Sequence, residues 1–273
     1  MIMVIKLILS DIDGTILNDN NEVDSDLKQT VKELKNKDIP FVLASARSPK
    51  GMLPIAKELG VLNNPIACYN GALVIKDLQN DEYSKILSHE LNVEEVKRII
   101  KTVHDKYNNV SINLYSGSDW YAENLDKWVK IESEITNLTP ILTDFDKLIE
   151  NNPVHKILLV SEPDEISVLL NDLERSNYDD SSFYLSKPNY LEITNSQVSK
   201  EKALRELTST YNLSLDQTMT LGDNYNDIPM LKIAGLGVAM ENAPTDVKDF
   251  ADAITEDNNK NGVSKAIKKY VLR

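Results

Sequence analysis

Acidic side chains gather in two short motifs that are far apart in the sequence. Asp11 and Asp13 are separated by one residue in LILSDIDGT, directly after an apolar run, and Asp223 and Asp227 lie in GDNYND. If the two motifs meet in the fold, mutual repulsion would raise the pKa values of these carboxyl groups unless a cation neutralised them. Oxygen ligands with few nitrogens nearby are typical of sites for a hard ion such as Mg²⁺. The pattern therefore predicts a magnesium site.

Each polar motif follows a predicted buried strand. The run Val4–Leu9 leads to Asp11, the run IPFVLA leads to Ser45, and the run TMTL leads to Asp223. Predicted helices alternate with these strands, which indicates a parallel sheet with right-handed crossovers. Ligands of such sheets bind outside the carboxyl ends of the strands. The sequence thus predicts that the three motifs share one crevice.

The middle of the chain has a different pattern. Paired strand signals alternate there with amphipathic helices, including a strand at 83–91 and a helix at 93–107. We therefore predict an α/β fold with a Rossmann-like parallel-sheet core formed by residues 1–82 and 189–273. A separate α+β domain is predicted as an insertion at 83–188.

Composition limits the classes of partner. The chain has 273 residues, of which 41% are hydrophobic, and a formal net charge of −13. This charge disfavours nucleic acid and anionic membranes as partners, so an anionic substrate would need a metal ion or a well-placed Lys. Cys68 is the only cysteine, which excludes an internal disulfide and fits a reducing compartment. We expect a cytoplasmic protein that is a monomer or a small homo-oligomer.

The order of the motifs resembles the haloacid dehalogenase superfamily. The matching segments are DIDGT at 11–15, Ser45 after FVLA, Lys200 in VSKEKAL and GDNYND at 222–227. A DxDGT motif followed much later by GDxxND is a specific signal. The long insertion after the second motif, the YNGA segment and the tail GVAMENAPTD are similar to Cof-type phosphatases, which carry a large α/β cap at this position.

The resemblance implies roles for the acidic residues. Asp11 would be the nucleophile that forms an aspartyl-phosphate, and Asp13 would act as general acid and then as general base. Mg²⁺ would be held by the Asp11 carboxylate, the Asp13 main-chain carbonyl and Asp223. Thr15 is expected to hydrogen-bond Asp13, and Asp227 to orient a lysine or a metal-bound water.

The resemblance also implies a phosphate site. Lys200 would neutralise both the phosphate and Asp11, although Lys202 is an alternative. The other residues expected to bind phosphate or substrate are the Ser45 hydroxyl, the Ala46 main-chain N–H, Ile12, Arg47 and Asn226. The sequence reads Ser-Ala-Arg where such proteins commonly have Thr-Gly-Arg, and Lys-Glu where they have Lys-Gly. Ser45 has the alternative of a helix cap, and Arg47 that of a surface ion pair.

These residues predict a Mg²⁺-dependent phosphomonoester hydrolase that acts on small phosphorylated metabolites, with phosphosugars as the first expectation. A phosphomutase or phosphotransferase with the same aspartyl-phosphate is the nearest alternative. A metal- and phosphate-binding signalling protein without turnover is a third. A short receiver domain is less consistent, because the second predicted strand ends in Ser-Ala-Arg and offers no acceptor Asp.

Overall fold

The chain folds into two compact units. The computed structural model describes residues 4–79 and 82–272. The first unit comprises residues 1–47, 52–86 and 199–273, and the second comprises residues 48–51 and 87–198. Both predicted boundaries of the insertion, 83 and 188, need correction. The strand predicted at 83–91 lies in the first sheet, not in the insertion, and the predicted end at 188 divides a strand pair of the second unit.

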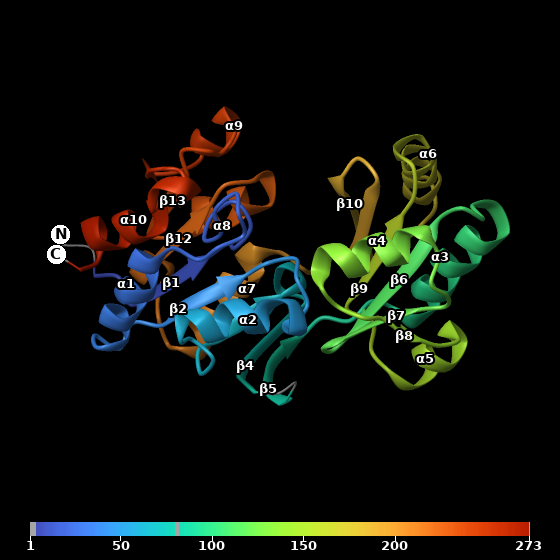
Figure 1. The fold of residues 1–273 in the computed structure, drawn as a ribbon, viewed down its shortest axis with the longest axis horizontal. Coiled ribbons are helices and arrows are strands. Elements are labelled where there is room, and N and C mark those ends of the chain that lie inside the picture. Colours follow the sequence, from blue (N-terminus) through green and yellow to red (C-terminus); the bar gives the residue numbers. More distant parts are fainter. Residues whose placement is uncertain (1–3, 80–81, 273) are drawn as a thin grey trace. The chain divides into compact units, whose positions relative to one another are not determined.

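The first unit contains a parallel sheet. Among the described residues its strands have the order β14-β13-β12-β1-β2-β3-β4-β5, and all pairs from β14 to β3 are parallel. Figure 1 shows β1 between β2 and β12, which are far apart in sequence. The strands are β1 (Leu7–Ser10), β2 (Phe41–Ala44), β3 (Ile66–Cys68), β4 (Leu73–Gln79), β5 (Glu82–Ser88), β12 (Thr218–Gly222), β13 (Leu236–Ala239) and β14 (Ala253–Ile254).

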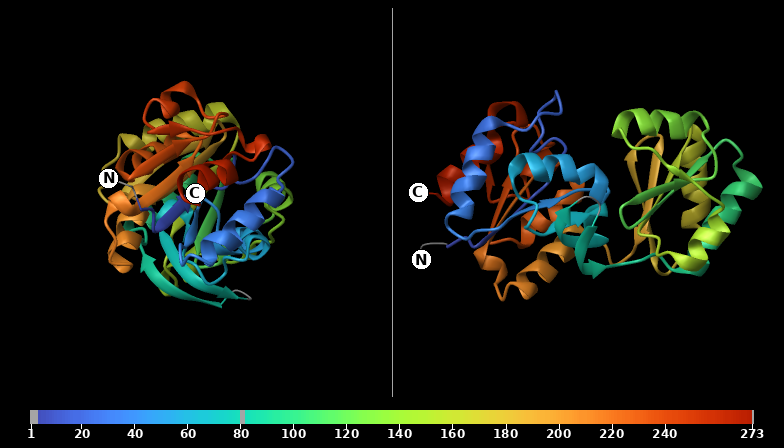
Figure 2. Two further views of the ribbon diagram at one scale, coloured as in Figure 1. Left: turned by 90° about the vertical axis from the view of Figure 1, so that its left-hand side faces the viewer. Right: turned by 60° about the horizontal axis from the view of Figure 1, so that its bottom comes forward.

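Helices connect the parallel strands, which confirms the predicted Rossmann-like core. The helices of this unit are α1 (Ser25–Lys35), α2 (Pro49–Leu59), α7 (Lys200–Thr210), α8 (Ile228–Ile233), α9 (Thr245–Lys248) and, after the last strand, α10 (Gly262–Tyr270). The helices α1 and α10, from opposite ends of the chain, pack together (Figure 2). The central strands β1, β2 and β12 are buried along their whole length, as expected for a sheet covered on both faces.

The second unit is an α+β layer. Its described strands have the order β10-β11-β9-β6-β7-β8. They are β6 (Ser111–Ser116), β7 (Asp119–Ala122), β8 (Ile141–Leu142), β9 (Lys156–Val160), β10 (Ser181–Lys187) and β11 (Tyr190–Asn195). Its helices are α3 (Val93–Lys106), α4 (Lys127–Thr136), α5 (Phe145–Asn151) and α6 (Pro163–Glu174).

The two faces of this second sheet differ in polarity. Side chains on one face join α3, α5 and α6 in a single apolar core, which includes Ile157 and Leu159 of β9. Because side chains alternate along a strand, Lys156 points to the other face, where its Nζ lies 3.3 Å from Oε2 of Glu192. The apolar residues Val96, Ile99, Ile100 and Val103 of α3 are buried in this core. No described helix is both long and apolar enough to cross a membrane.

Candidate active site

Strand register brings the predicted motifs together at one edge of the first sheet. Ser10 pairs with Leu221 of β12 on one side and with Leu43 of β2 on the other. The residues that follow, Asp11 among them, therefore lie side by side at the carboxyl ends of three parallel strands. The Asp11 N–H continues the pairing by donating to Leu221 O at 2.9 Å, and the Ser10 hydroxyl donates to Asp11 O at 2.9 Å.

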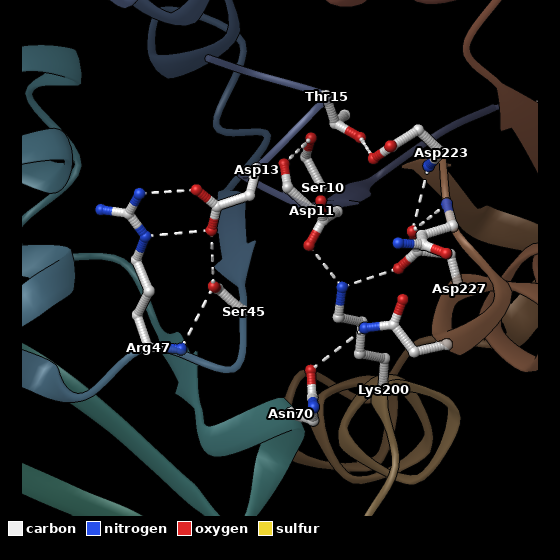
Figure 3. Close-up of polar contacts among 12 residues, drawn as sticks. Ser10, Asp11, Asp13, Thr15, Ser45, Arg47, Asn70, Lys200, Asp223 and Asp227 are labelled. Carbon is white, nitrogen blue, oxygen red and sulfur yellow. Dashed lines mark hydrogen bonds and ion pairs between the residues drawn. The ribbon is translucent and has the colours of Figure 1, made fainter. Parts of the chain in front are cut away.

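A buried lysine joins two of the carboxylates. Lys200 is the first residue of α7, its side chain is 1% exposed, and its Nζ donates to Oδ1 of Asp11 and, at 2.7 Å, to Oδ1 of Asp227 (Figure 3). The contact with Asp11 thus comes from Lys200, the first of the two lysines considered from the sequence. Burial alone would lower the pKa of Lys200, but the charges of Asp11 and Asp227 raise it above its usual value. Lys200 is therefore a fixed positive charge beside Asp11.

Asp227 uses both of its carboxylate oxygens to hold its neighbours in place. Besides the bond from Lys200, its Oδ2 accepts the main-chain N–H groups of Asp223 and Asn224, each at 3.0 Å. The side chain is fully buried. Asp227 thus fixes both the lysine and the main chain of the GDNYND loop, which is the contact with Lys200 predicted for it.

Replacing Asp227 with alanine is expected to lower the free energy of unfolding by about 3 kcal/mol. The change removes one partner of a buried ion pair and leaves two main-chain donors without their acceptor. Urea denaturation would measure it, with Asp249→Ala as the control because Asp249 is exposed and should change stability by less than about 0.5 kcal/mol. A loss for Asp227→Ala no larger than that of the control would contradict the structural role.

Three carboxylates form a group that can hold a metal ion. One oxygen from each of Asp11, Asp223 and Asp227 lies within 4.8 Å of the others. Burial raises the pKa of Asp11 well above its usual value, against the opposing charge of Lys200, and burial raises the pKa of Asp223 to about 6. A cation among these oxygens would oppose both shifts, so the donor set fits an oxygen-preferring metal ion.

The prediction for Thr15 was wrong. Its hydroxyl donates to Oδ1 of Asp223 at 2.7 Å, rather than to Asp13. Gly14, between these residues, has φ +84°, and a Cβ there would lie 2.9 Å from Cγ of Asp223. The turn after β1 therefore curls toward the GDNYND loop, and Thr15 contacts the three-carboxylate group that can hold a metal ion.

Asp13 points away from Lys200 and Asp223 (Figure 3), and its carboxylate pairs with Arg47. Nε of Arg47 lies 2.9 Å from Oδ2 of Asp13, and Nη2 lies 2.5 Å from Oδ1. The Asp13 side chain is 51% exposed and that of Arg47 34%, so the pair can be reached from solvent. Figure 3 shows the resulting division, with Asp13, Ser45 and Arg47 in one group and Asp11, Lys200, Asp223 and Asp227 in the other.

The Ser45 hydroxyl belongs to the Asp13 group. It lies 3.4 Å from Oδ2 of Asp13 and accepts the Arg47 N–H at 3.2 Å. The turn after β3 supports this loop, because the Asn70 N–H donates to Ser45 O at 2.8 Å and the Tyr69 N–H donates to Arg47 O at 3.1 Å. Backbone contacts thus fix the loop that carries the predicted phosphate ligands.

Three more residues are predicted to bind phosphate, namely Asn226, Ile12 and Ala46. Asn226 donates from Nδ2 to Oδ1 of Asn70 at 3.4 Å. The side chain of Ile12 is fully buried in the core, so any phosphate contact from Ile12 would involve its main chain. Ala46 lies between Ser45 and Arg47 in the supported loop. Phosphate binding by these residues stays a prediction.

Two supporting residues were missed at the sequence level. Asn70 lies in the YNGA segment, where Asn-Gly is also typical of a simple turn, but it is buried, has φ +56° and links the Ser45 loop to Asn226. Ser10, which holds the carbonyl of Asp11, gave no signal because it reads as an ordinary strand residue. The YNGA segment was the only pattern in the sequence that pointed toward Asn70.

Comparisons with known proteins agree with this geometry. The family model of haloacid dehalogenase-like hydrolases matches residues 8–267. A putative phosphatase of Haemophilus influenzae is 32% identical over 263 residues, which are 96% of this chain and 97% of that protein. The 5-amino-6-(5-phospho-D-ribitylamino)uracil phosphatase YcsE of Bacillus subtilis is 29% identical over 269 residues, 98% of this chain and 96% of that protein.

A solved structure extends the match to the whole fold. The crystal structure of a haloacid dehalogenase-like hydrolase from Bacteroides thetaiotaomicron superposes with a TM-score of 0.88 at 31% identity, over 97% of this chain and 99% of that chain. The family model and both relatives also span the core and the inserted unit. The chain therefore belongs to the haloacid dehalogenase-like hydrolases and is a phosphatase of the Cof type.

Proposed function

We propose that this protein is a Mg²⁺-dependent phosphomonoester hydrolase that acts on small phosphorylated metabolites through an aspartyl-phosphate on Asp11. The observation that carries the proposal is the pairing of Asp11 with buried Lys200 inside a carboxylate group that fits a hard cation. A carboxylate at the strand end, with a fixed positive charge beside it, is suited to meet an anionic phosphate.

Asp11 and Asp13 divide the chemistry between them. A carboxylate oxygen of Asp11 attacks phosphorus, the bond from phosphorus to the leaving oxygen breaks, and Asp13 gives its proton to that oxygen. A water molecule then attacks the same phosphorus and passes a proton to Asp13. The bond between phosphorus and the Asp11 oxygen breaks, so phosphate is released and the Asp11 carboxylate is restored. The exposure of Asp13 supports this role, since its carboxyl group must reach both the leaving group and water.

The other residues of the site bind and orient. Lys200 offsets the charge of the phosphate and of Asp11, while the Ser45 hydroxyl, the Ala46 N–H, Ile12, Arg47 and Asn226 contact phosphate oxygens or the substrate. The Asp11 carboxylate, the Asp13 main-chain carbonyl and Asp223 would hold Mg²⁺, which when bound supplies charge stabilisation to the transferring phosphoryl group. Asp227 keeps Lys200 and the GDNYND main chain in place.

Phosphosugars and phosphorylated polyols are the proposed substrate class. The Bacillus relative named above hydrolyses a phosphoribityl compound by its name, which supports a substrate with a polyhydroxylated chain. A phosphate-release screen with Mg²⁺ over phosphosugars, nucleotides and phosphorylated cofactors would test this, with Asp11→Asn as the blank. We expect the largest release from phosphosugars or polyol phosphates. Release from no compound above the blank would contradict hydrolysis.

We also propose that the second unit acts as a cap that selects the leaving group. The core motifs contact only the phosphoryl group, which all phosphomonoesters share, so discrimination must come from contacts to the rest of the substrate. The second unit joins the core at Ser199, directly before Lys200. This attachment beside a residue that would meet the phosphate supports a substrate-reading role.

Exchange of residues 87–198 for the equivalent segment of the Haemophilus relative is expected to change the order of preferred metabolites by about tenfold or more. Hydrolysis of p-nitrophenyl phosphate should persist and stay dependent on Asp11, because the phosphoryl site is unchanged. The measurement is kcat/KM over the same metabolite panel. A folded chimera with unaltered preferences would place selectivity in core loops such as 47–51 and 69–72.

A further inference from the structure

Two asparagines from the end of the chain hold the turn that carries Asp13. Nδ2 of Asn242 donates to Gly14 O at 2.8 Å, and Nδ2 of Asn258 donates to Leu17 O at 3.0 Å. The pair is joined, because the Asn258 N–H donates to Oδ1 of Asn242 at 3.1 Å. We call Asn242 and Asn258 the asparagine clamp. Asn242 lies in the GVAMENAPTD tail, but neither asparagine was among the predicted site residues.

The clamp bonds the carbonyl of a glycine in the left-handed backbone region. Gly14 adopts φ +84°, a conformation in which glycine lacks the steric restraint of a side chain, so its peptide can rotate unless a neighbour holds it. The hydrogen bond from Asn242 ends on that carbonyl. Asp13 directly precedes Gly14, and Thr15 directly follows it. The orientation of this one peptide therefore affects both flanking side chains.

Asp11 does not depend on the clamp in the same way. Its N–H is tied to Leu221 O of the neighbouring strand, and its carboxylate is held by Lys200. Asp13 lies beyond the end of β1, and its carboxylate meets a partly exposed arginine, Arg47. Loss of the clamp should thus disturb Asp13 while the nucleophile stays in place.

We propose that Asn242, braced by Asn258, is a positioning residue that aligns Asp13 with the leaving oxygen. This inference rests on the proposed function of Asp13 as the group that protonates the leaving oxygen while the new bond from Asp11 to phosphorus forms. Asn242 is exposed, so its replacement removes the restraint on Gly14 without opening the core.

Two aryl phosphates of similar shape provide the test. Phenolate needs a proton as it leaves, whereas the far less basic p-nitrophenolate leaves without one, so the ratio of kcat/KM for phenyl phosphate to that for p-nitrophenyl phosphate reports general-acid catalysis. For Asn242→Ala at saturating Mg²⁺ we expect this ratio to fall about tenfold, which corresponds to about 1.4 kcal/mol in barrier height. A general loss of folded enzyme would lower both values equally and leave the ratio unchanged.

Matched variants isolate the hydrogen bond to Gly14. Asn242→Asp keeps the acceptor for the Asn258 N–H but loses the Nδ2 donor, so it should lower the ratio as much as Asn242→Ala does. Asn259→Ala is the control, because Oδ1 of Asn259 accepts the N–H of Asp19 farther along the same loop. This control should leave the ratio within about twofold of the wild type.

Asp13→Asn separates this inference from the proposed function. If Asp13→Asn lowers the ratio and Asn242→Ala does not, the clamp has no positioning role and the function of Asp13 stands. If Asp13→Asn leaves the ratio unchanged, Asp13 is not the general acid, and the inference about the clamp fails with it. A fall in the ratio for Asp13→Asn, Asn242→Ala and Asn242→Asp, but not for Asn259→Ala, is the result that we expect.

Discussion

Replacement of Asp11 with asparagine is expected to lower kcat for p-nitrophenyl phosphate by about 10⁴-fold or more. The amide keeps the size of the side chain but cannot attack phosphorus, so the first chemical step is lost rather than weakened. Lys200 keeps its second partner, Asp227, at 2.7 Å, and the fold should therefore survive the change. Steady-state kinetics with a thermal melt of the same preparation would measure both effects.

Asp249→Asn serves as the control for this replacement, because it makes the same chemical change at an exposed position. It should retain wild-type turnover. If Asp11→Asn kept most of the wild-type kcat, another group would have to be the nucleophile, and the proposed mechanism would be wrong at its first step.

Loss of the Asp223 carboxylate, a proposed Mg²⁺ ligand, is expected to produce the second large effect. Asp223→Asn should raise the Mg²⁺ concentration needed for half-maximal activity by about 100-fold or more, since it removes a charged ligand. Thr15→Val should raise it by about tenfold, because the Thr15 hydroxyl only orients Asp223. EDTA should abolish the phosphatase activity of the wild type. Ca²⁺ should support little turnover because its coordination shell is larger and looser than that of Mg²⁺. Metal titrations of activity and calorimetric titrations of Mg²⁺ would measure these changes.

Thr15→Ser is the matched control for the hydroxyl contact, since it keeps the donor to Asp223. Its Mg²⁺ requirement should stay near that of the wild type. Full activity in excess chelator would remove the metal from the mechanism, and equal behaviour of Thr15→Val and Thr15→Ser would show that the hydroxyl does not support the site.

The alternation of buried strands with helices and the meeting of the carboxylates were predictable because their signals are local. Buried parallel strands have nearly continuous apolar runs, and the residue that follows each run must lie at the same edge of the sheet. This reasoning placed Asp11, Ser45 and Asp223 together without knowledge of the register. The buried contact of Lys200 with both Asp11 and Asp227 agrees with the charge balance that the acidic group requires.

The side-chain pairings were less predictable because several acceptors lie within reach of one donor. The Thr15 hydroxyl had been expected to bond Asp13, but the positive φ of Gly14 turns it toward Asp223. The sequence allows Arg47 either a substrate-facing role or a surface ion pair, and its pairing with Asp13 depends on the path of the loop after β2. Side-chain rotamers and loop paths are set by packing in the folded protein, and the spacing of residues along the sequence does not determine them.

Contacts between distant segments were also hidden from the sequence. Asn242 comes after β13 and Asn258 after β14, the two strands at one edge of the sheet. Their hydrogen bonds to the turn after β1 depend on the order of the strands in the sheet. The strand β5 illustrates the same limit, because its own pattern cannot reveal which of the two sheets it joins. Local propensity defines such a strand, but its partners are set by the rest of the fold.

Trapping of the covalent intermediate tests the central claim most directly. The Asp13→Asn variant should accumulate the phosphorylated enzyme with p-nitrophenyl phosphate, because the first leaving group needs no proton whereas hydrolysis of the intermediate lacks its base. Acid quenching, borohydride reduction of the acyl phosphate and peptide mapping would then locate the modified residue. The account predicts homoserine at position 11. Homoserine at another aspartate, or none while p-nitrophenol is being released, would contradict it.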